Sequence, residues 1–99
     1  MFNFFNNALG QSSTLSTGEK FELLQKARQD LVGEIQAIIE YDNHIHSSTD
    51  RIANETWTDI MQEELVHVGE LLVLLDYLDP NQKQFVQQGI EEFNERVGK

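Results

Sequence analysis

Apolar residues recur at helical spacing through most of the chain, and no alternating strand pattern competes with them. In the first predicted helix, positions taken alternately three and four apart form one stripe: Ala27, Leu31, Glu34, Ile38, Tyr41 and Ile45. The second predicted helix has a longer stripe: Ala53, Trp57, Ile60, Glu64, His67, Leu71, Leu74 and Leu78. Each stripe predicts the buried face of an amphipathic helix. Both stripes are apolar or aromatic except near the middle, where polar residues interrupt them.

Capping residues indicate where these two helices begin and end. Ser16 and Glu19 have the spacing of a capping box, which predicts a helix that starts there and runs to about His46. Residues 47–50, with the sequence SSTD, supply N-cap types for a second helix. That helix is expected to run to about Leu78. The short connection predicts an antiparallel hairpin.

A third, more polar helix is expected at the C-terminal end. Asp79 is an N-cap type, Pro80 suits the first helical position, and Gln82 stands where a capping box places it. The helix has a weak apolar stripe: Phe85, Val86, Ile90 and Phe93. We expect it to pack on the hairpin or on a neighbouring subunit.

The predicted organisation is therefore all-α and has three parts. Residues 1–18 are rich in Asn, Ser, Thr and Gly and are expected to be flexible, with an aromatic cluster at Phe2, Phe4 and Phe5. Residues 19–79 form the two-helix hairpin, and residues 80–99 form the C-terminal helix.

The polar residues that interrupt the two stripes are expected to lie at one level of the hairpin. Glu34 precedes Ser48, the centre of the connection, by 14 residues, and Glu64 follows it by 16. At about 1.5 Å per residue, the two glutamates are roughly 21 and 24 Å from the turn. His67 is one helical turn beyond Glu64, on the same face. Neither stripe alone requires this coincidence.

Two amphipathic helices cannot close a core, and three polar side chains are a poor ligand set. Both problems are solved if two hairpins dimerise about a two-fold axis into a four-helix bundle. The interior then holds two copies each of Glu34, Glu64 and His67. Four carboxylates and two imidazoles match a dinuclear iron or manganese centre, with a Glu from two helices and Glu-x-x-His from the other two. We expect two iron ions per subunit pair, manganese being the alternative metal.

Composition excludes several other classes of function. The chain has 17 acidic and 7 basic residues and a formal net charge of −10, which argues against binding nucleic acid or anionic membranes. It has no cysteine, so disulfides, Cys-ligated zinc and iron–sulfur clusters are excluded. The longest apolar run, 71–75, is too short to span a membrane, and the N-terminus lacks the features of a secretory signal. We expect a cytoplasmic protein, or one held in a compartment within the cytoplasm.

The hairpin resembles a known family of ferritin-like proteins. Glu-x6-Tyr at Glu34 to Tyr41 and Glu-x-x-His at Glu64 to His67 are similar to the ferritin di-iron signature. A ferritin subunit has two such helix pairs and this chain has one. The single pair, the 30-residue gap between the glutamates and the turn sequence EYDNHIHSSTD look like the encapsulated ferritins, over roughly residues 30–80.

This resemblance implies a ferroxidase, which binds Fe(II) at a subunit interface and oxidises it with O2 for iron storage or detoxification. It implies that Glu34, Glu64 and His67 from two subunits are ligands and that Tyr41 lies beside them. The family forms ring-shaped oligomers, often decamers, that work inside an encapsulin shell. The chain departs from the family pattern at Glu40, where a tryptophan is common, and in its C-terminal sequence FNERVGK, which differs from the usual shell-targeting extension.

Two other functions fit the same residues. A rubrerythrin-like peroxidase or a di-manganese enzyme would use the same ligands. It would need an external electron donor, because a chain without cysteine cannot contain a rubredoxin domain. A non-catalytic helical assembly module would instead use a hydrogen bond between Glu64 and His67 to fix the register of the helices. His44 and His46, at the end of the first helix, are interpreted as a solvated helix end rather than as a second metal site.

Overall fold

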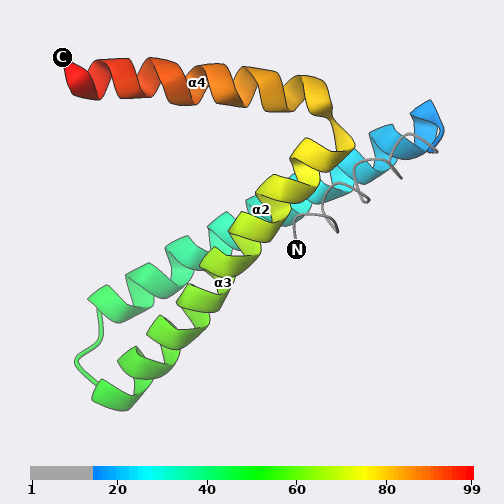
Figure 1. Ribbon diagram of the computed structural model, residues 1–99. Coiled ribbons are helices and arrows are strands. Elements are labelled where there is room, and N and C mark those ends of the chain that lie inside the picture. The colour runs from blue at the N-terminus through cyan, green and yellow to red at the C-terminus, as the bar shows by residue number, and fades with distance from the viewer. Residues whose placement is uncertain (1–14) are drawn as a thin grey trace, which may run out of the picture.

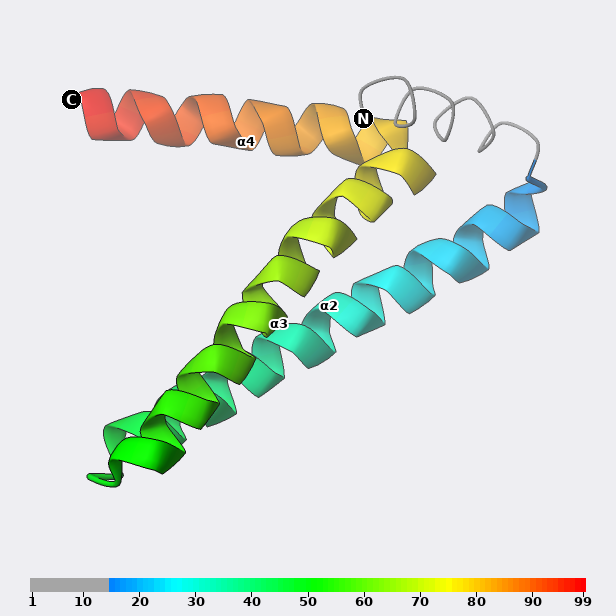
Figure 2. The same cartoon turned by 60° about the horizontal axis from the view of Figure 1, so that its bottom comes forward.

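The computed structural model describes residues 15–99, which form three helices and no strand. Helix α2 spans Thr17–His46, α3 spans Arg51–Leu78 and α4 spans Pro80–Gly98. Helices α2 and α3 lie side by side as an antiparallel hairpin, and α4 turns away from it at the open end (Figures 1 and 2). None of these helices is long and apolar enough to cross a membrane. The predictions for the first 14 residues, including the phenylalanine cluster, lie outside the described residues.

Side-chain caps place the ends of the hairpin helices. The Ser16 hydroxyl accepts a hydrogen bond from the Glu19 backbone N–H at 3.1 Å, as the capping-box spacing predicts. The Asp50 carboxylate accepts one from the Ala53 N–H at 2.8 Å and starts α3. At the end of α2, the Ser47 hydroxyl donates to the Asn43 carbonyl at 2.9 Å. These bonds satisfy backbone groups that a helix end leaves without an internal partner.

The buried face of α2 is the predicted one, whereas that of α3 differs near its end. Every member of the predicted α2 stripe is buried or partly buried, and Ala27 is only 2% exposed. On α3, the prediction that Leu74 is buried is wrong: it is 39% exposed, and its neighbour Leu75 is 4% exposed. Beyond Glu64 the inward positions follow steps of four, three, four and three, which reach Leu75 and Leu78. A 3.6-residue period permits either order of steps.

The core that one chain forms is small. It consists of Ala27, Leu75 and Leu78, with four partly buried neighbours, and no large side chain in residues 15–99 is fully buried. The radius of gyration is 17.3 Å, whereas a compact chain of this length has about 13 Å. Large apolar side chains stay exposed along the hairpin: Phe21, Val32, Ile35, Ile39, Leu65, Val66, Leu72 and Val73. Much apolar surface therefore remains available for association.

Helix α4 does not pack along its own hairpin. Within residues 15–99 its backbone approaches only α3, to which it is joined, and none of its residues is buried (Figure 2). Asp79 ends α3 and caps α4, accepting hydrogen bonds from the N–H groups of Asn81 and Gln82 at 3.1 and 3.3 Å. Arg28 of α2 braces this corner, with Nη2 2.9 Å from Gln82 Oε1 and 4.0 Å from Asp79 Oδ2. Of the two packing arrangements expected for α4, the one on its own hairpin is absent here.

Candidate metal centre

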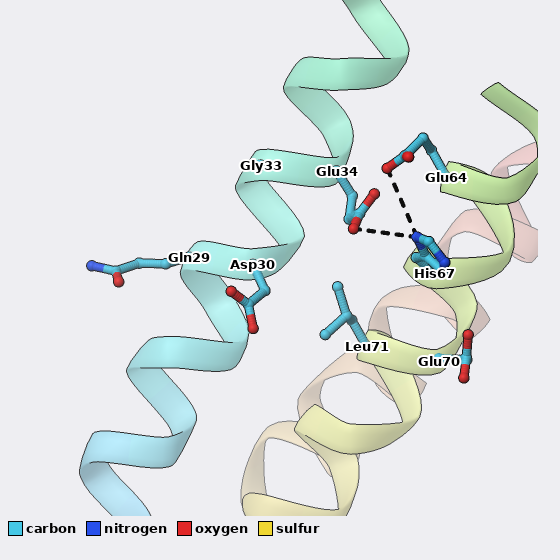
Figure 3. A pocket seen from close by; sticks show the side chains of 8 residues that line it. All are labelled: Gln29, Asp30, Gly33, Glu34, Glu64, His67, Glu70 and Leu71. Atoms are coloured by element: carbon cyan, nitrogen blue, oxygen red, sulfur yellow. Dashed lines mark ion pairs between the residues drawn. The ribbon is translucent and has the colours of Figure 1, made fainter. Parts of the chain in front are cut away.

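Three of the predicted site residues meet across the two helices of the hairpin. Glu34 extends from α2 toward α3, and Glu64 and His67 extend from α3 toward α2 (Figure 3). Glu64 and His67 share one side of α3 because residues three apart in a helix are neighbours. The side chains therefore converge at one level, as their similar distances from the turn predict.

The three side chains are close enough to share one ion. One ligand atom from each of Glu34, Glu64 and His67 lies within 4.8 Å of the others. His67 Nδ1 is 3.4 Å from Glu34 Oε1 and 3.8 Å from Glu64 Oε2. Both separations are longer than the usual N–H···O hydrogen bond of about 2.9 Å. The imidazole therefore does not satisfy either carboxylate well, and a cation among the three would contact all of them.

The burial of the two carboxylates also favours a cation at this site. The side chains of Glu34 and Glu64 are 22% and 20% exposed, and Glu34 Oε2 is buried without a hydrogen-bond partner. A buried carboxylate oxygen without a partner is costly. Two carboxylates and an imidazole are the donor types that iron and manganese accept. The residues present thus fit the metal that their pattern predicts.

The site opens on one flank of the hairpin instead of lying inside it. The His67 side chain is 48% exposed, so the expectation that it belongs to the buried stripe is wrong for a single chain. The three residues line an open pocket of about 520 Å³. Asp30 and Leu71 also line it, one turn away on each helix, whereas Gln29 and Glu70 extend away from the ligand atoms (Figure 3). Sequence reasoning missed Asp30, although its position four residues before Glu34 places it on the same side of α2.

The same flank continues from the metal site into an apolar hollow toward the open end of the hairpin. Asp30 lines both pockets, so they adjoin at this residue. The second is lined mainly by apolar side chains, including Leu15, Leu23, Leu74 and Leu78. We call the metal pocket and this hollow together the open flank. Leu74 departs from the predicted burial pattern because its side chain faces this hollow instead of α2.

The remaining predicted residues form an aromatic group nearer the turn. Tyr41 is partly buried, and its ring meets the His44 ring edge-on at 6.2 Å between centroids. His44 in turn lies 5.1 Å from the Trp57 ring. Tyr41 is two turns from Glu34, or about 10 Å along the helix axis. The predicted place of Tyr41 beside the ligands stays a prediction. His44 and His46 are both exposed in the last turn of α2, in agreement with their interpretation as a solvated helix end.

Comparison with known proteins now identifies the family. The crystal structure of an encapsulated ferritin domain from Pyrococcus furiosus superposes with a TM-score of 0.77 and 35% sequence identity, covering 81% of this chain and 82% of that one. The chain belongs to the encapsulated ferritin family. The resemblance inferred from the two glutamate motifs and the turn is thereby confirmed, as is the all-α, ferritin-like fold.

This encapsulated ferritin is also similar to one part of a longer protein. The chain is 35% identical over 79 residues to a ferritin-like–encapsulin shell fusion protein of Pyrococcus furiosus. The match covers 80% of the chain and 23% of the fusion protein, so the chain spans about a quarter of that relative's length. No protein-family model matches the sequence.

Proposed function

We propose that this encapsulated ferritin is a ferroxidase, which oxidises Fe(II) to Fe(III) with O2 for iron storage or detoxification. The observation that supports it best is the meeting of Glu34, Glu64 and His67 within 4.8 Å on an open flank. Membership of a ferritin-like family supports the choice of iron. Fe(II) is the substrate here, and each ion gives up one electron to O2.

The site of one chain supports a centre shared by two chains. Glu34, Glu64 and His67 are half of the donor set that holds a dinuclear centre in a four-helix bundle. The open flank exposes these donors beside apolar residues such as Leu23 and Leu74, each 39% exposed. A second hairpin packed on this flank would bury the leucines and bring a second set of donors. We therefore propose a homodimer with two iron ions per subunit pair.

In this proposal the side chains promote iron oxidation through their charge and position more than through proton transfer. Glu34 and Glu64 provide anionic oxygen ligands, which stabilise Fe(III) more than Fe(II) and so favour loss of the electron. His67 adds a neutral nitrogen ligand. The negative pocket, with Asp30 at its margin, attracts a cation from solvent. Tyr41 is proposed to lie near the centre in the dimer, acting through its neighbours.

The proposed partner beyond the dimer is an encapsulin shell. One relative joins a ferritin-like part and an encapsulin shell in one fusion protein, which supports such an association for this chain. A shell compartment in the cytoplasm is the location that follows. A ring-shaped oligomer, with a decamer as one form, remains part of this proposal.

Anaerobic titration with Fe(II), followed by native mass spectrometry, tests the shared centre. We expect two irons per pair of chains and none held by a monomer. Admitting O2 should then produce Fe(III) absorbance with O2 consumption. Binding of one iron per monomer would contradict the shared centre, because the ligands of a single hairpin would then suffice.

The oxidant and the metal distinguish this proposal from its rivals. Rapid oxidation by hydrogen peroxide with slow oxidation by O2 would favour a rubrerythrin-like peroxidase. Tight retention of Mn(II) with no Fe(II) oxidation would favour a di-manganese enzyme. A protein that takes up neither ion would favour an assembly module, in which Glu64 and His67 serve only to fix the register of the helices.

A further inference from the structure

The metal pocket is lined by a carboxylate that is not among the proposed ligands. Asp30 precedes Glu34 by four residues, so it lies on the same side of α2 and about 6 Å away along the helix axis. It lines the pocket, but it does not belong to the group of three residues whose ligand atoms lie within 4.8 Å of one another. Asp30 can therefore hold a cation next to the proposed centre without being one of its ligands.

The carboxylate of Asp30 faces the pocket without a charged partner in the described chain. Figure 3 shows Asp30 on the side of α2 that faces Leu71 of α3, whose side chain is apolar. No ion pair within residues 15–99 involves Asp30, although Lys26 lies one turn before it and lines the adjoining hollow. The negative charge of Asp30 is thus available to a cation that approaches the pocket from solvent.

Gly33 leaves the surface between Asp30 and Glu34 without a side chain. Gly33 lines the same pocket, and a Cβ placed on it would meet nothing within 4 Å. Glycine in the middle of a helix lowers its stability relative to alanine, and no close approach of another helix requires a glycine here. The absent side chain leaves room for a hydrated ion to move along α2 from Asp30 to Glu34.

The other end of the donor set offers a cation a less favourable approach. Toward the turn, the inward positions next to Glu34 and Glu64 are Ile38 and Ile60, and both are partly buried. A hydrated cation that passed these side chains would lose water without gaining a ligand, which is costly. The charged approach to the donors is therefore the one beside Asp30.

We propose that Asp30 is a transit ligand, which takes up a hydrated divalent cation at the margin of the pocket and passes it beside Gly33 to Glu34. The step is a ligand exchange without electron transfer: an Asp30 oxygen replaces a water on the ion, and a Glu34 oxygen then replaces Asp30. This inference deepens the proposed ferroxidase function and rests on its shared metal centre. A second hairpin on the open flank would cover the donors, so Fe(II) would reach them along the margin where Asp30 lies.

Anaerobic mixing of the full chain with Co(II) measures cation uptake without oxidation. Stopped-flow fluorescence follows the quenching of Trp57, the one tryptophan of the chain, which lies seven residues or about 10 Å from Glu64 along α3. We expect Asp30→Asn to slow uptake by about tenfold, within the range that charged clefts add to association rates. The final amount of Co(II) per chain, measured by native mass spectrometry, should not change. Asp30→Glu, which keeps a carboxylate, should restore most of the rate.

Glu70 provides the matched control for charge. Glu70→Gln removes the same charge from the same pocket, but the Glu70 side chain extends away from the ligand atoms (Figure 3). Its uptake rate should equal that of the natural protein. Equal rates for Asp30→Asn and Glu70→Gln would overturn the transit role.

Salt and a second substitution separate ligation from other roles of Asp30. At about 1 M NaCl the Debye length is about 3 Å, so attraction through space is screened, whereas a ligand that touches the ion still acts. The difference between Asp30→Asn and the natural protein should persist there, and its disappearance would overturn direct ligation. Lys26→Gln should not slow uptake. A loss of rate equal to that of Asp30→Asn would instead assign Asp30 to a pair with Lys26.

Two glycines test the passage beside α2. Gly33→Leu should slow uptake, because its side chain would stand between Asp30 and Glu34. Gly69→Leu is the control: Gly69 also has open space around it, but it lies outside the pocket. Equal uptake rates for these two variants would contradict a passage beside Gly33.

Failure of this inference differs from failure of the proposed function. If every variant takes up Co(II) at the natural rate, Asp30 is not a transit ligand and the metal centre stands. If the natural protein takes up Co(II) faster than Asp30→Asn but does not oxidise Fe(II), the transit ligand stands and the ferroxidase proposal is wrong. If the natural protein takes up no Co(II), both are wrong.

Discussion

The hairpin and α4 both carry apolar stripes at helical spacing, but their acidic residues lie in different places relative to those stripes. In the hairpin, Glu34 and Glu64 interrupt the stripe and are largely shielded from solvent. In α4, the carboxylates of Glu91, Glu92 and Glu95 lie away from the line of apolar residues at Val86, Ile90 and Phe93. A stripe without polar residues needs only another apolar surface. A stripe that includes carboxylates needs, in addition, a ligand that offsets their charge.

This difference separates positions that serve stability from positions that serve function. Ala27, Leu75 and Leu78 hold the two helices together near the open end of the hairpin. Midway along the hairpin, two carboxylates and an imidazole replace apolar side chains and reduce the apolar area that the helices bury. The chain thus gives up stability at the level of the proposed metal site.

The largest expected effect is on iron chemistry. Glu64→Ala removes one of two anionic ligands in each hairpin, and we expect Fe(II) oxidation to fall by more than about 100-fold, beyond the range typical for residues that only support ligands. Initial rates of O2 consumption measure it. Glu55→Ala, on the same helix but exposed and paired only with Arg51, is the control and should keep its activity. A Glu64→Ala variant with normal rates would remove the distinction between the two stripes.

Loss of packing in the hairpin should give the next largest effect. Leu75 is 4% exposed, so Leu75→Ala should lower the free energy of unfolding by about 2–5 kcal/mol. Leu74→Ala, at a residue that faces the open flank, should cost clearly less in the metal-free protein. Urea unfolding at one fixed protein concentration compares them, because association also contributes to stability. Equal losses would place both leucines in the core and support the original prediction for Leu74.

The cost of the carboxylates can be measured without metal. Replacing Glu34 with leucine removes a buried oxygen that has no hydrogen-bond partner, and the burial of such a group costs about 1–3 kcal/mol. We therefore expect Glu34→Leu to unfold at higher urea concentration than the natural protein when a chelator is present. Added Fe(II) should reverse the order, because only the natural protein gains from binding. A destabilised metal-free variant would show that Glu34 serves the fold.

Local sequence signals predicted the helices well, and they predicted that Glu34, Glu64 and His67 lie together. The capping residues Ser16, Asp50 and Asp79 act on neighbouring backbone groups, so their effect can be read from spacing alone. Glu64 and His67 are likewise fixed relative to each other by the turn of one helix. Their alignment with Glu34 followed from similar distances to a short connection.

The features that sequence did not predict depend on contacts between elements. The choice between Leu74 and Leu75 depends on how α3 rotates against α2, and both orders of steps fit the pattern. The half-exposed position of His67 reflects the open flank, which a stripe on one helix does not reveal. The direction of α4 was also open, because its stripe finds no partner within the described chain.

The smallest predicted effect concerns the cap that separates α4 from the hairpin. Asp79→Ala removes the hydrogen bonds to Asn81 and Gln82 and the ion pair with Arg28. Because α4 is exposed, we expect a loss of only about 0.5–1 kcal/mol, the low end of the range for N-caps, measured by circular dichroism during thermal unfolding. Asp79→Asn, which keeps an acceptor, should retain most of the stability. If instead Asp79→Ala also slowed Fe(II) oxidation, the corner would influence the metal site, and the two regions would not be as independent as their separate stripes imply.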